Sequence, residues 1–479
     1  MRIINLEVNE LPPEVLKEYI NKNQNSTLHK LKVENLLTTY KTMALDVEKE
    51  KLYPSQTWAS FNTGKEFSLH NCYWYSDPLN QNDLIWNQLA AHNKNVGVIG
   101  SIHSSKYPTD LMKNKYYKFY IPDCFGDKIK TKPTRYINFQ RLNASLVEGS
   151  SRVTSLKNLL KIIFRNLPLM ILRSRIFGIS KFSLSMIAKI IYKSIISKNK
   201  ELLRTAQFAP LSSIFIDLYL KSKPDYSTLF TNHLAGNMHR YWYAYKPEQF
   251  NTKDKYSTSW VSKNQNTFNL SLDLIDDFIK HLMNNISMEE TSIIITSSMG
   301  QEANPEFDKR YFSQYDGKIE NMKLFLQGLN KFYKKSNYKE IEYIYERNMA
   351  PQYGFKLNTL HQGNLQLGLD RMKNYVSHIG LKSKFDLIEN DSFTMTLDPY
   401  SDIDLQKSYT LDQANNKYNS LGINFHKIND HHSGSHSPEG VLTVINGSDK
   451  FHSLIQEKLN KDGNLDYLHF KNIVLKYLT

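Results

Sequence analysis

The sequence predicts an α/β fold built on one mostly parallel, doubly wound sheet. Short runs rich in Ile, Leu and Val recur along the 479 residues, and most are separated by stretches with helical periodicity. Buried parallel strands have this near-continuous apolar character because helices cover both faces of the sheet. The hydrophobic fraction of 40% allows a sizeable core and excludes a wholly disordered chain.

The expected elements follow one another in a regular order. Residues 2–9 are expected to form a buried strand, and a proline in the first turn suits a helix over residues 13–22. Further strands are expected at residues 95–101, 226–232, 291–297 and 441–445, with a helix over residues 272–286. Ligands of such sheets bind at the carboxyl ends of the strands, so functional residues are expected there.

Two regions interrupt this order, and we expect both to be inserted into a single domain of residues 1–479. The first, residues 151–223, is apolar and basic. The second, residues 305–417, is polar and aromatic and contains a helical pattern at residues 318–336. No tandem repeat or low-complexity linker divides the sequence, which favours one large domain over a string of independent ones.

Composition excludes several other classes of protein. Two cysteines, Cys72 and Cys124, exclude a disulfide scaffold and a four-cysteine metal site. A transmembrane helix would need a run of about 18 apolar residues, and the sequence has none. Glu7 and Glu10 interrupt the first apolar stretch too early for a signal peptide. These observations favour a cytoplasmic location.

The positive charge is concentrated in one region. The formal net charge is +14, and residues 151–223 hold fourteen basic residues against Glu201 and Asp217. Cations recur among Ile, Leu and Phe at helical spacing, which predicts amphipathic helices with one basic face, punctuated by Pro168 and Gly178. Two interpretations stay open. In the first, the region attaches the protein to an acidic ligand or to the inner surface of an anionic membrane, as a peripheral protein. In the second, it is an insertion packed on the main domain, with a basic face exposed to solvent. No nucleic-acid motif accompanies the charge, so no nucleic-acid partner is expected.

Five segments, in order, resemble the alkaline phosphatase superfamily, in particular its type I phosphodiesterase/nucleotide pyrophosphatase branch. They are IINLEVNELPPEVLKEY (3–19), YPSQTWASFNTGKEFSLHNCYWYSDP (53–78), NHLAGNMHRYW (232–242), IIITSSMGQ (293–301) and HHSGSHSPEGVLTVING (431–447). Together they span nearly the whole chain. The resemblance implies the α/β fold of that superfamily and chemistry in which two divalent metal ions clamp phosphoryl oxygens.

Carried over by this resemblance, one of the two metal sites loses its ligands. The first Asp of the family falls on Asn9, with Glu7 and Glu10 alongside. The Asp-His pair of the fourth segment falls on Ser297 and Ser298. Neutral amide and hydroxyl oxygens do not hold zinc without charged or imidazole ligands, so this site is expected to be lost.

The resemblance implies at most one metal ion at the other site. In the third segment the Asp of the family falls on Ala235, whereas its His is kept as His239, and the final His is kept as His436. Zinc normally takes three or four protein ligands. We expect one zinc or manganese ion bound by His239 and His436, with a third ligand from this list: His432, His431 or Asp430.

The nucleophile of the family falls on Pro54, and Ser55 and Thr57 are the nearest hydroxyl groups. We expect one of them, with Thr57 preferred, to act as the nucleophile. Ser101 and His103 follow another strand, and a Ser–His pair there is an alternative.

Other side chains of the same segments are expected to bind substrate. Arg240 is expected to act in catalysis by pairing with a phosphate or sulfate oxyanion, with a surface ion pair as the alternative. Trp58 suits stacking on a sugar or base, although core packing explains it equally well. The remaining expected contacts are polar groups at strand ends: Asn9, Asn232, Ser297 and Ser298. The two serines have a second interpretation, as caps of the following turn.

Two functions are therefore weighed. The first is a phospho- or sulfo-ester hydrolase or transferase that acts on an anionic glycan, lipid or nucleotide precursor. The second is a catalytically degenerate member of the superfamily, kept as a binding or assembly protein of surface-polysaccharide or envelope biosynthesis. The basic residues 151–223 would then be its docking face.

Overall fold

The fold is described from a computed structural model of the chain. The described residues are 1–126, 129–149, 156–251, 256–304, 315–334, 341–346, 352–358, 365–381, 383–389, 392–397, 411–427 and 432–479. The expected ligands Asp430 and His431 lie outside them.

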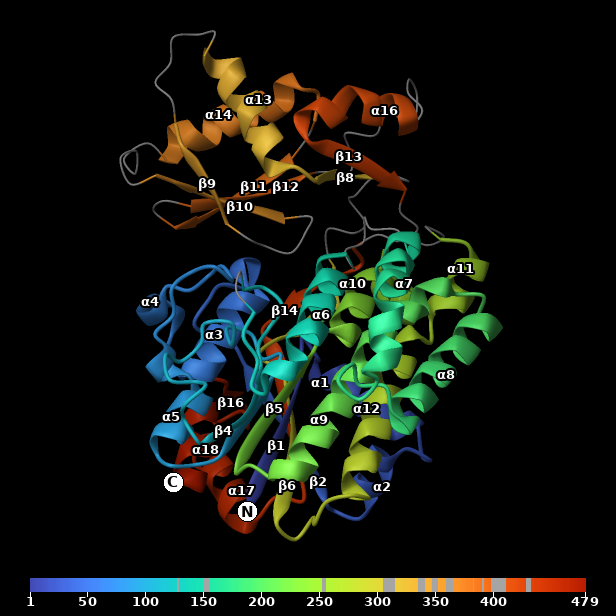
Figure 1. Cartoon of the computed structure of the whole chain (residues 1–479), viewed down its shortest axis with the longest axis vertical. Helices are drawn as coiled ribbons and strands as arrows, with labels where there is room; N and C mark the ends of the chain where they lie inside the picture. Colours follow the sequence, from blue (N-terminus) through green and yellow to red (C-terminus); the bar gives the residue numbers. More distant parts are fainter. Residues whose placement is uncertain are drawn as a thin grey trace.

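A central eight-stranded sheet organises the larger part of the molecule (Figure 1). In spatial order its strands are β16 (Leu465–Asp466), β2 (Leu37–Met43), β15 (Glu439–Ile445), β6 (Thr291–Thr296), β1 (Arg2–Val8), β5 (Tyr226–Thr231), β3 (Val96–Ile99) and β4 (Tyr117–Ile121). The five strands from β6 to β4 are parallel to one another, and β15 runs antiparallel to both of its neighbours.

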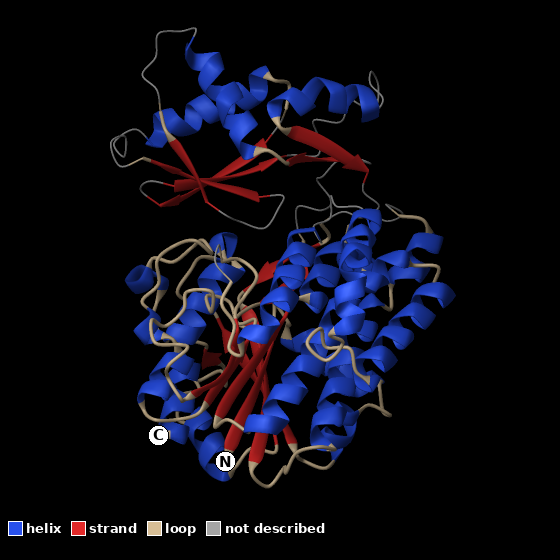
Figure 2. Cartoon of the chain, in the orientation of Figure 1, coloured by secondary structure: helices blue, strands red, loops and turns tan. Residues whose placement is uncertain are grey.

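Helices cover both faces of this sheet (Figure 2), so the prediction of a mostly parallel, doubly wound α/β fold is confirmed. Ile4, Leu6 and Val8 of β1 point to one core, and Ile3 to the other, as the alternation of a strand requires. The first core contains α1 (Pro13–Lys22), α9 (Phe208–Ser222), α10 (His233–Tyr245) and α12 (Thr267–Met283). The second contains α3 (Pro54–Thr63), α5 (Ile85–Ala91), α17 (Asp449–Gln456) and α18 (His469–Leu478).

The five strands expected from apolar runs are all present, within two residues of the expected bounds. Sequence reasoning missed β2 and β4, because LTTYKTM and YKFYI carry polar residues and lack a long aliphatic run. The remaining helices of this part are α2 (Thr27–Val33), α4 (Phe67–His70), α6 (Ile137–Gly149) and α11 (Thr258–Asn264).

The described residues between 315 and 427 form a second lobe with its own apolar core, beyond the carboxyl edge of the large sheet (Figure 1). Its elements are β8 (Tyr315–Ile319), α13 (Met322–Lys334), β9 (Tyr343–Glu346), β10 (Gln352–Leu357), α14 (Leu365–His378), β11 (Ser383–Glu389), β12 (Ser392–Leu397), α16 (Leu411–Tyr418) and β13 (Ile423–Lys427). The helix expected over residues 318–336 is therefore shorter, because Lys318 and Ile319 pair with β13. The boundaries 305 and 417 stay predictions.

The basic region contains α7 (Leu156–Leu172) and α8 (Lys181–Ile196), followed by a 3-10 helix (Lys200–Gln207) and by α9. Gly178 separates α7 from α8 with a positive φ of 69°, as expected of a helix-ending glycine. Pro168, however, lies inside α7 and does not end it. Both Pro168 and Phe164, whose carbonyl group loses its partner, are exposed, so solvent can satisfy that carbonyl group. No helix among the described residues is both long and apolar enough to cross a membrane.

Candidate metal centre

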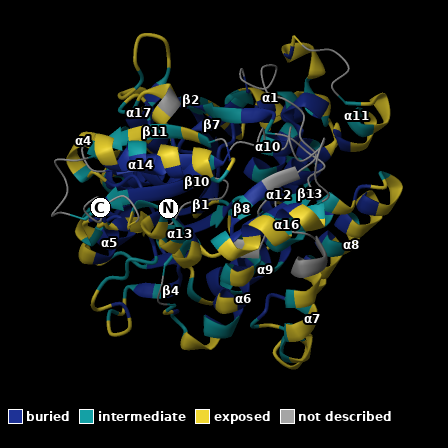
Figure 3. Ribbon diagram, turned by 90° about the horizontal axis from the view of Figure 1, so that it is seen from above, coloured by how far each residue is buried: buried dark blue, intermediate teal, exposed yellow. Residues whose placement is uncertain are grey.

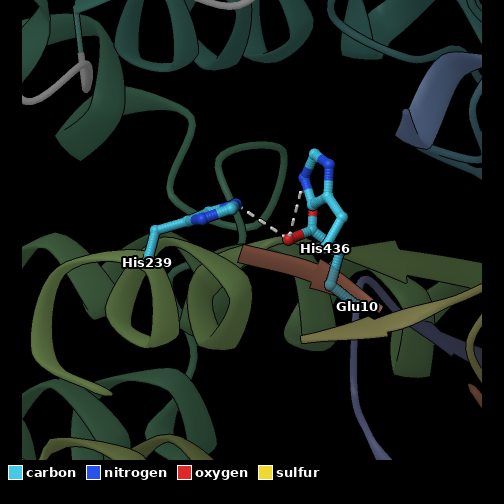
Figure 4. A group of neighbouring side chains, drawn as sticks. All are labelled: Glu10, His239 and His436. Atoms are coloured by element: carbon cyan, nitrogen blue, oxygen red, sulfur yellow. Dashed lines mark ion pairs between the residues drawn. The ribbon is translucent and has the colours of Figure 1, made fainter. Parts of the chain in front are cut away.

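Three side chains from distant parts of the sequence meet at the carboxyl edge of the sheet (Figure 4). Glu10 follows β1, and His239 lies on α10. His436 lies on β14 (Gly434–Ser437), which pairs antiparallel with β7 (Gly300–Ala303) so that His436 faces Gln301. One ligand atom from each of the three residues lies within 4.8 Å of the others. Among the described residues, this is the group of His, Cys, Asp and Glu side chains that satisfies such a test.

Glu10 is the centre of the group. Its φ of +59° is rare for a residue with a side chain and turns the chain sharply after β1. The fully buried carboxylate places Oε2 at 2.9 Å from Nε2 of His239 and 3.6 Å from Nε2 of His436. Gln301 donates to the same oxygen, and Asn9 donates to Oε1 at 2.8 Å. The carboxylate is thus held by four neighbours.

The two imidazoles are oriented by backbone carbonyl groups. Nδ1 of His239 lies 3.1 Å from the carbonyl oxygen of Gly434, and Nδ1 of His436 lies 2.8 Å from that of Leu52. A carbonyl oxygen can only accept, so each Nδ1 carries a proton. With Nδ1 engaged by a carbonyl group, each ring turns Nε2 towards Glu10, which is how histidines are fixed in metal sites.

The buried carboxylate of Glu10 needs a positive charge beside it. Burial alone would raise the pKa of the Glu10 carboxyl group, but the positive charges of His239 and His436 and their hydrogen bonds outweigh it and lower this pKa to about 2. Burial lowers the pKa of His436, with Glu10 opposing the shift. An ionised carboxylate facing two unprotonated Nε2 atoms is unfavourable unless protons or a metal ion lie between them.

The geometry fits one small divalent ion. Zinc binds carboxylate oxygen and imidazole nitrogen at about 2.0–2.2 Å, which places tetrahedral ligand atoms about 3.4 Å apart. The separations of 2.9 and 3.6 Å from Glu10 bracket that value. The side chains of His239 and His436 are 15% and 21% exposed, so the group is partly accessible to solvent. Three protein ligands would leave a coordination position open for substrate.

The group of three does not include His432, which stays a prediction as a ligand. The ring of His432 stacks on that of His239, with centroids 4.5 Å apart and planes at 5°. Glu10 is the carboxylate of the group, because the left-handed turn at this residue directs its side chain towards α10. A buried acid directly after the first strand, next to Asn9, was the signal available in the sequence.

The expected nucleophiles are buried near the start of α3. The Thr57 hydroxyl group lies 2.8 Å from that of Ser298, and both residues are fully buried. Ser55 donates instead to the carbonyl oxygen of Tyr73. The alternative pair is not formed: Ser101 bonds to the Thr228 hydroxyl group at 3.1 Å, and Nε2 of His103 lies 2.6 Å from the carbonyl oxygen of Ser55.

The other expected substrate contacts have internal roles. Asn9 accepts from Nε1 of Trp58 at 2.8 Å and donates to Asn232 at 2.7 Å, so these three residues form one network. Trp58 is fully buried and packs edge-on against Phe230, as in the core interpretation of this residue.

Ser297 donates to the carbonyl oxygen of Leu11 at 2.7 Å and accepts from the Val441 N–H at 2.9 Å, so its hydroxyl group ties three segments together. Arg240 follows His239 on α10 and is only 9% exposed. Neither residue is in the group of three ligands.

No family model matches this sequence, and no curated protein matches it. Solved structures similar to the chain include phosphonoacetate hydrolase from Sinorhizobium meliloti 1021, with a TM-score of 0.40, 11% identity and coverage of 98% of this chain and 94% of that chain. Alkaline phosphatase PafA has a TM-score of 0.39 and 14% identity, with coverage of 92% of this chain and 90% of that chain. Murine ectonucleotide pyrophosphatase/phosphodiesterase 5 has a TM-score of 0.36 and 9% identity, with coverage of 100% of this chain and 95% of that chain. At such low TM-scores, the chemistry rests on the side chains of this chain.

Proposed function

We propose that the protein is a phospho- or sulfo-ester hydrolase or transferase with a single divalent metal ion bound by Glu10, His239 and His436. One observation carries this proposal: two imidazoles, each fixed through Nδ1 by a carbonyl group, direct Nε2 at one buried carboxylate oxygen. A bound divalent ion would polarise the ester and lower the pKa of a coordinated hydroxyl group or water.

The chain itself contributes charge, orientation and a hydroxyl group. Glu10 brings the negative charge, and Gln301 and Asn9 keep its carboxylate in place. Thr57 is the proposed nucleophile, because Ser298 holds its hydroxyl group and because Leu52, which orients His436, lies five residues before it. The substrates proposed are anionic glycan, lipid or nucleotide precursors, whose negative charge suits a cationic centre in a chain of net charge +14.

The proposal is tested on protein purified without chelator or a polyhistidine tag. We expect about one equivalent of zinc or manganese per chain, and turnover of an aryl phosphodiester, phosphomonoester or sulfate ester that chelation abolishes. Glu10→Gln, His239→Ala and His436→Ala should each lose metal and turnover. His92→Ala is the matched control, because His92 is an exposed histidine whose Nδ1 also bonds a carbonyl group. Chelator-sensitive turnover that survives all three site substitutions would refute the proposal.

A second candidate is a binding or assembly protein that keeps the metal site without turnover. It is favoured by the complete burial of Thr57 and Ser298. It is also favoured because Ser297 and Ser298 stand where the resembled family has a metal-binding Asp-His pair. The two candidates differ in one measurement. Thr57→Ala should abolish turnover while metal content is kept if the protein is an enzyme of this kind. If a metal-loaded wild-type protein turns over none of the three ester classes, the second candidate is favoured.

A further inference from the structure

The outer helices α7 and α8 expose apolar side chains in regular stripes. On α7, Leu160, Phe164, Leu167 and Ile171 recur at the spacing of one helical face, and all are exposed, Phe164 to 65%. On α8, the exposed residues Leu184, Ala188, Ile191 and Ile195 repeat the same spacing. These two sets, with Leu172, Tyr192 and Ile196, are called the apolar stripes below.

The opposite side of α8 packs on the protein. Ser183, Met186, Ile190 and Ser194 are buried, and Met186 and Ile190 belong to the first core. The exposed stripe is therefore a second apolar face rather than the core-facing face of an ordinary amphipathic helix. Ten of the twenty-one exposed large apolar side chains among the described residues lie on α7 and α8. Such a concentration marks an interaction surface, whereas scattered exposed apolar residues are normal.

The charge around the stripes has one sign. Residues 156–200 contain ten Lys and Arg residues and no Asp or Glu. Within the described part of the chain, Lys189 of this stretch forms an ion pair with Asp277 at 2.7 Å. Lys161, Arg165, Lys181 and Lys193 are exposed beside the stripes. Figure 3 shows both helices at the outer edge of the molecule, with yellow marking their exposed residues.

We propose that α7 and α8 dock the protein on an anionic lipid bilayer, with the apolar stripes inserted among the acyl chains and the flanking cations at the headgroups. Helices of seventeen and sixteen residues with an apolar face and basic flanks suit a position in the plane of the interface. The cations add electrostatic attraction to anionic lipids near the surface.

Charge complementarity favours a bilayer over a second copy of this chain. Pairing the stripes of two copies would bring the exposed cations beside them (Lys161, Arg165, Lys181 and Lys193) towards the same cations of the other copy, without an acidic residue from either stretch. The exposed side chains are mostly Ile and Leu, whereas the cores of protein interfaces are enriched in Tyr, Trp, Met and Arg. This surface is independent of the proposed metal site, so either proposal can fail without the other.

The test is sedimentation of the full chain with vesicles of phosphatidylcholine, with and without phosphatidylglycerol. We expect binding to the anionic vesicles that weakens as salt rises, because the headgroup attraction is screened. Phe164→Ser with Ile171→Ser, and separately Ile191→Ser with Ile195→Ser, should each weaken binding by about tenfold or more. The matched control is Leu69→Ser with Val33→Ser, because these residues are 71% and 66% exposed but lie on other helices. The control should bind as the wild type does.

A second readout reports insertion directly. Trp in the variant Tyr192→Trp should shift its emission to shorter wavelength on anionic vesicles and be quenched by brominated acyl chains. The proposal is overturned by absence of binding to anionic vesicles at low salt, or by equal losses in the stripe and control variants. It is also overturned if sedimentation shows a dimer that the stripe variants dissociate, since the stripes would then be covered by a second copy.

Discussion

The carbonyl oxygen of Gly434 lies 3.1 Å from Nδ1 of His239, and this contact depends on the absence of a side chain at residue 434. A Cβ atom there would lie 2.6 Å from the carbonyl oxygen of Met238 and 2.7 Å from Oε1 of Gln301. The strand that carries His436 can therefore approach α10 closely only with glycine at this position.

Gly434→Ala should consequently disturb the metal site as well as the packing. We expect a loss of unfolding free energy of about 1–3 kcal/mol, because backbone or Gln301 must move to relieve the overlap. Zinc affinity should fall as well, since His239 loses its orienting carbonyl group. Chemical denaturation and calorimetric zinc titration measure the two effects.

Gly236→Ala is the control, on the same helix α10. Among the described residues, no atom outside the helix's own backbone and the two chain neighbours lies within 4 Å of the added Cβ. Alanine should therefore stabilise the helix by about 0.5–1 kcal/mol and leave zinc affinity unchanged. Equal zinc affinities of Gly434→Ala and Gly236→Ala would contradict the assigned role of the Gly434 carbonyl group.

Metal binding should depend on pH through the histidines. The Glu10 carboxyl group, with its pKa lowered to about 2 by the histidine charges against the effect of burial, stays ionised throughout the useful range. Burial lowers the pKa of His436, so this ring is neutral at pH 7. Protons and a metal ion compete for the imidazole nitrogen atoms, so acidification weakens metal binding.

Zinc or manganese affinity measured by calorimetry should fall as the pH is lowered from about 8 to about 5, because protons displace the ion from the imidazoles. Glu10→Gln should bind weakly at every pH, because the anionic ligand is gone. An affinity that rises on acidification would show that the ion is not bound by neutral imidazoles.

The sequence predicted the carboxyl edge and the two histidines but not the carboxylate. Aliphatic runs such as residues 291–297 determine buried strands almost alone, and the residues after them must meet at one edge. The position of the Glu10 side chain depends on the left-handed backbone conformation of this one residue, and the neighbouring residue types do not predict that conformation. The alignment by segments put Ala235 at the carboxylate position beside His239 and His436, whereas the turn after β1 brings Glu10 to them.

The basic region shows a second limit of sequence patterns. Helical periodicity at residues 156–172 and 181–196 gave both helices. Periodicity cannot tell which face is buried when Ile and Leu surround the helix. In α8 the small residues Ser183 and Ser194 are buried while Ile191 and Ile195 face outwards, because close packing on α9 and on the 3-10 helix (Lys200–Gln207) requires small side chains.

The second lobe contacts the larger part through Gly354 on β10. A Cβ atom at this position would lie 2.8 Å from the ring of Trp74, and Lys356 on the same strand forms an ion pair with Asp77. Gly354→Val should push β10 away from Trp74 and loosen the contact between the two parts.

The expected result is faster proteolysis of Gly354→Val between the lobe and the large sheet, with little change in the unfolding of the sheet itself. Lys384→Gln, which changes an exposed lysine on β11 of the same lobe, should behave as the wild type does. Unchanged proteolysis of Gly354→Val would show that this contact does not fix the lobe.

Glu7 makes stability depend on pH in the direction opposite to Glu10. It is fully buried on β1, and burial raises the pKa of its carboxyl group to about 7, with hydrogen bonds from Thr228 and Ser101 opposing the shift. Among the described residues, Oε2 of Glu7 has no hydrogen-bond partner. The folded protein therefore prefers the protonated acid, whereas the unfolded chain ionises near pH 4.5.

Between about pH 4.5 and pH 7 the folded state holds a proton that the unfolded chain has lost, so the contribution of Glu7 to stability falls as pH rises through this window and is constant above it. Glu7→Gln keeps the shape and cannot ionise. Urea unfolding should show the variant more stable than the wild type by about 1–3 kcal/mol at pH 8, with the difference vanishing at about pH 4.5. Glu34→Gln, at an exposed site, should match the wild type at both pH values. A difference for Glu7→Gln that is the same at both pH values would mean that Glu7 does not change its ionisation on folding.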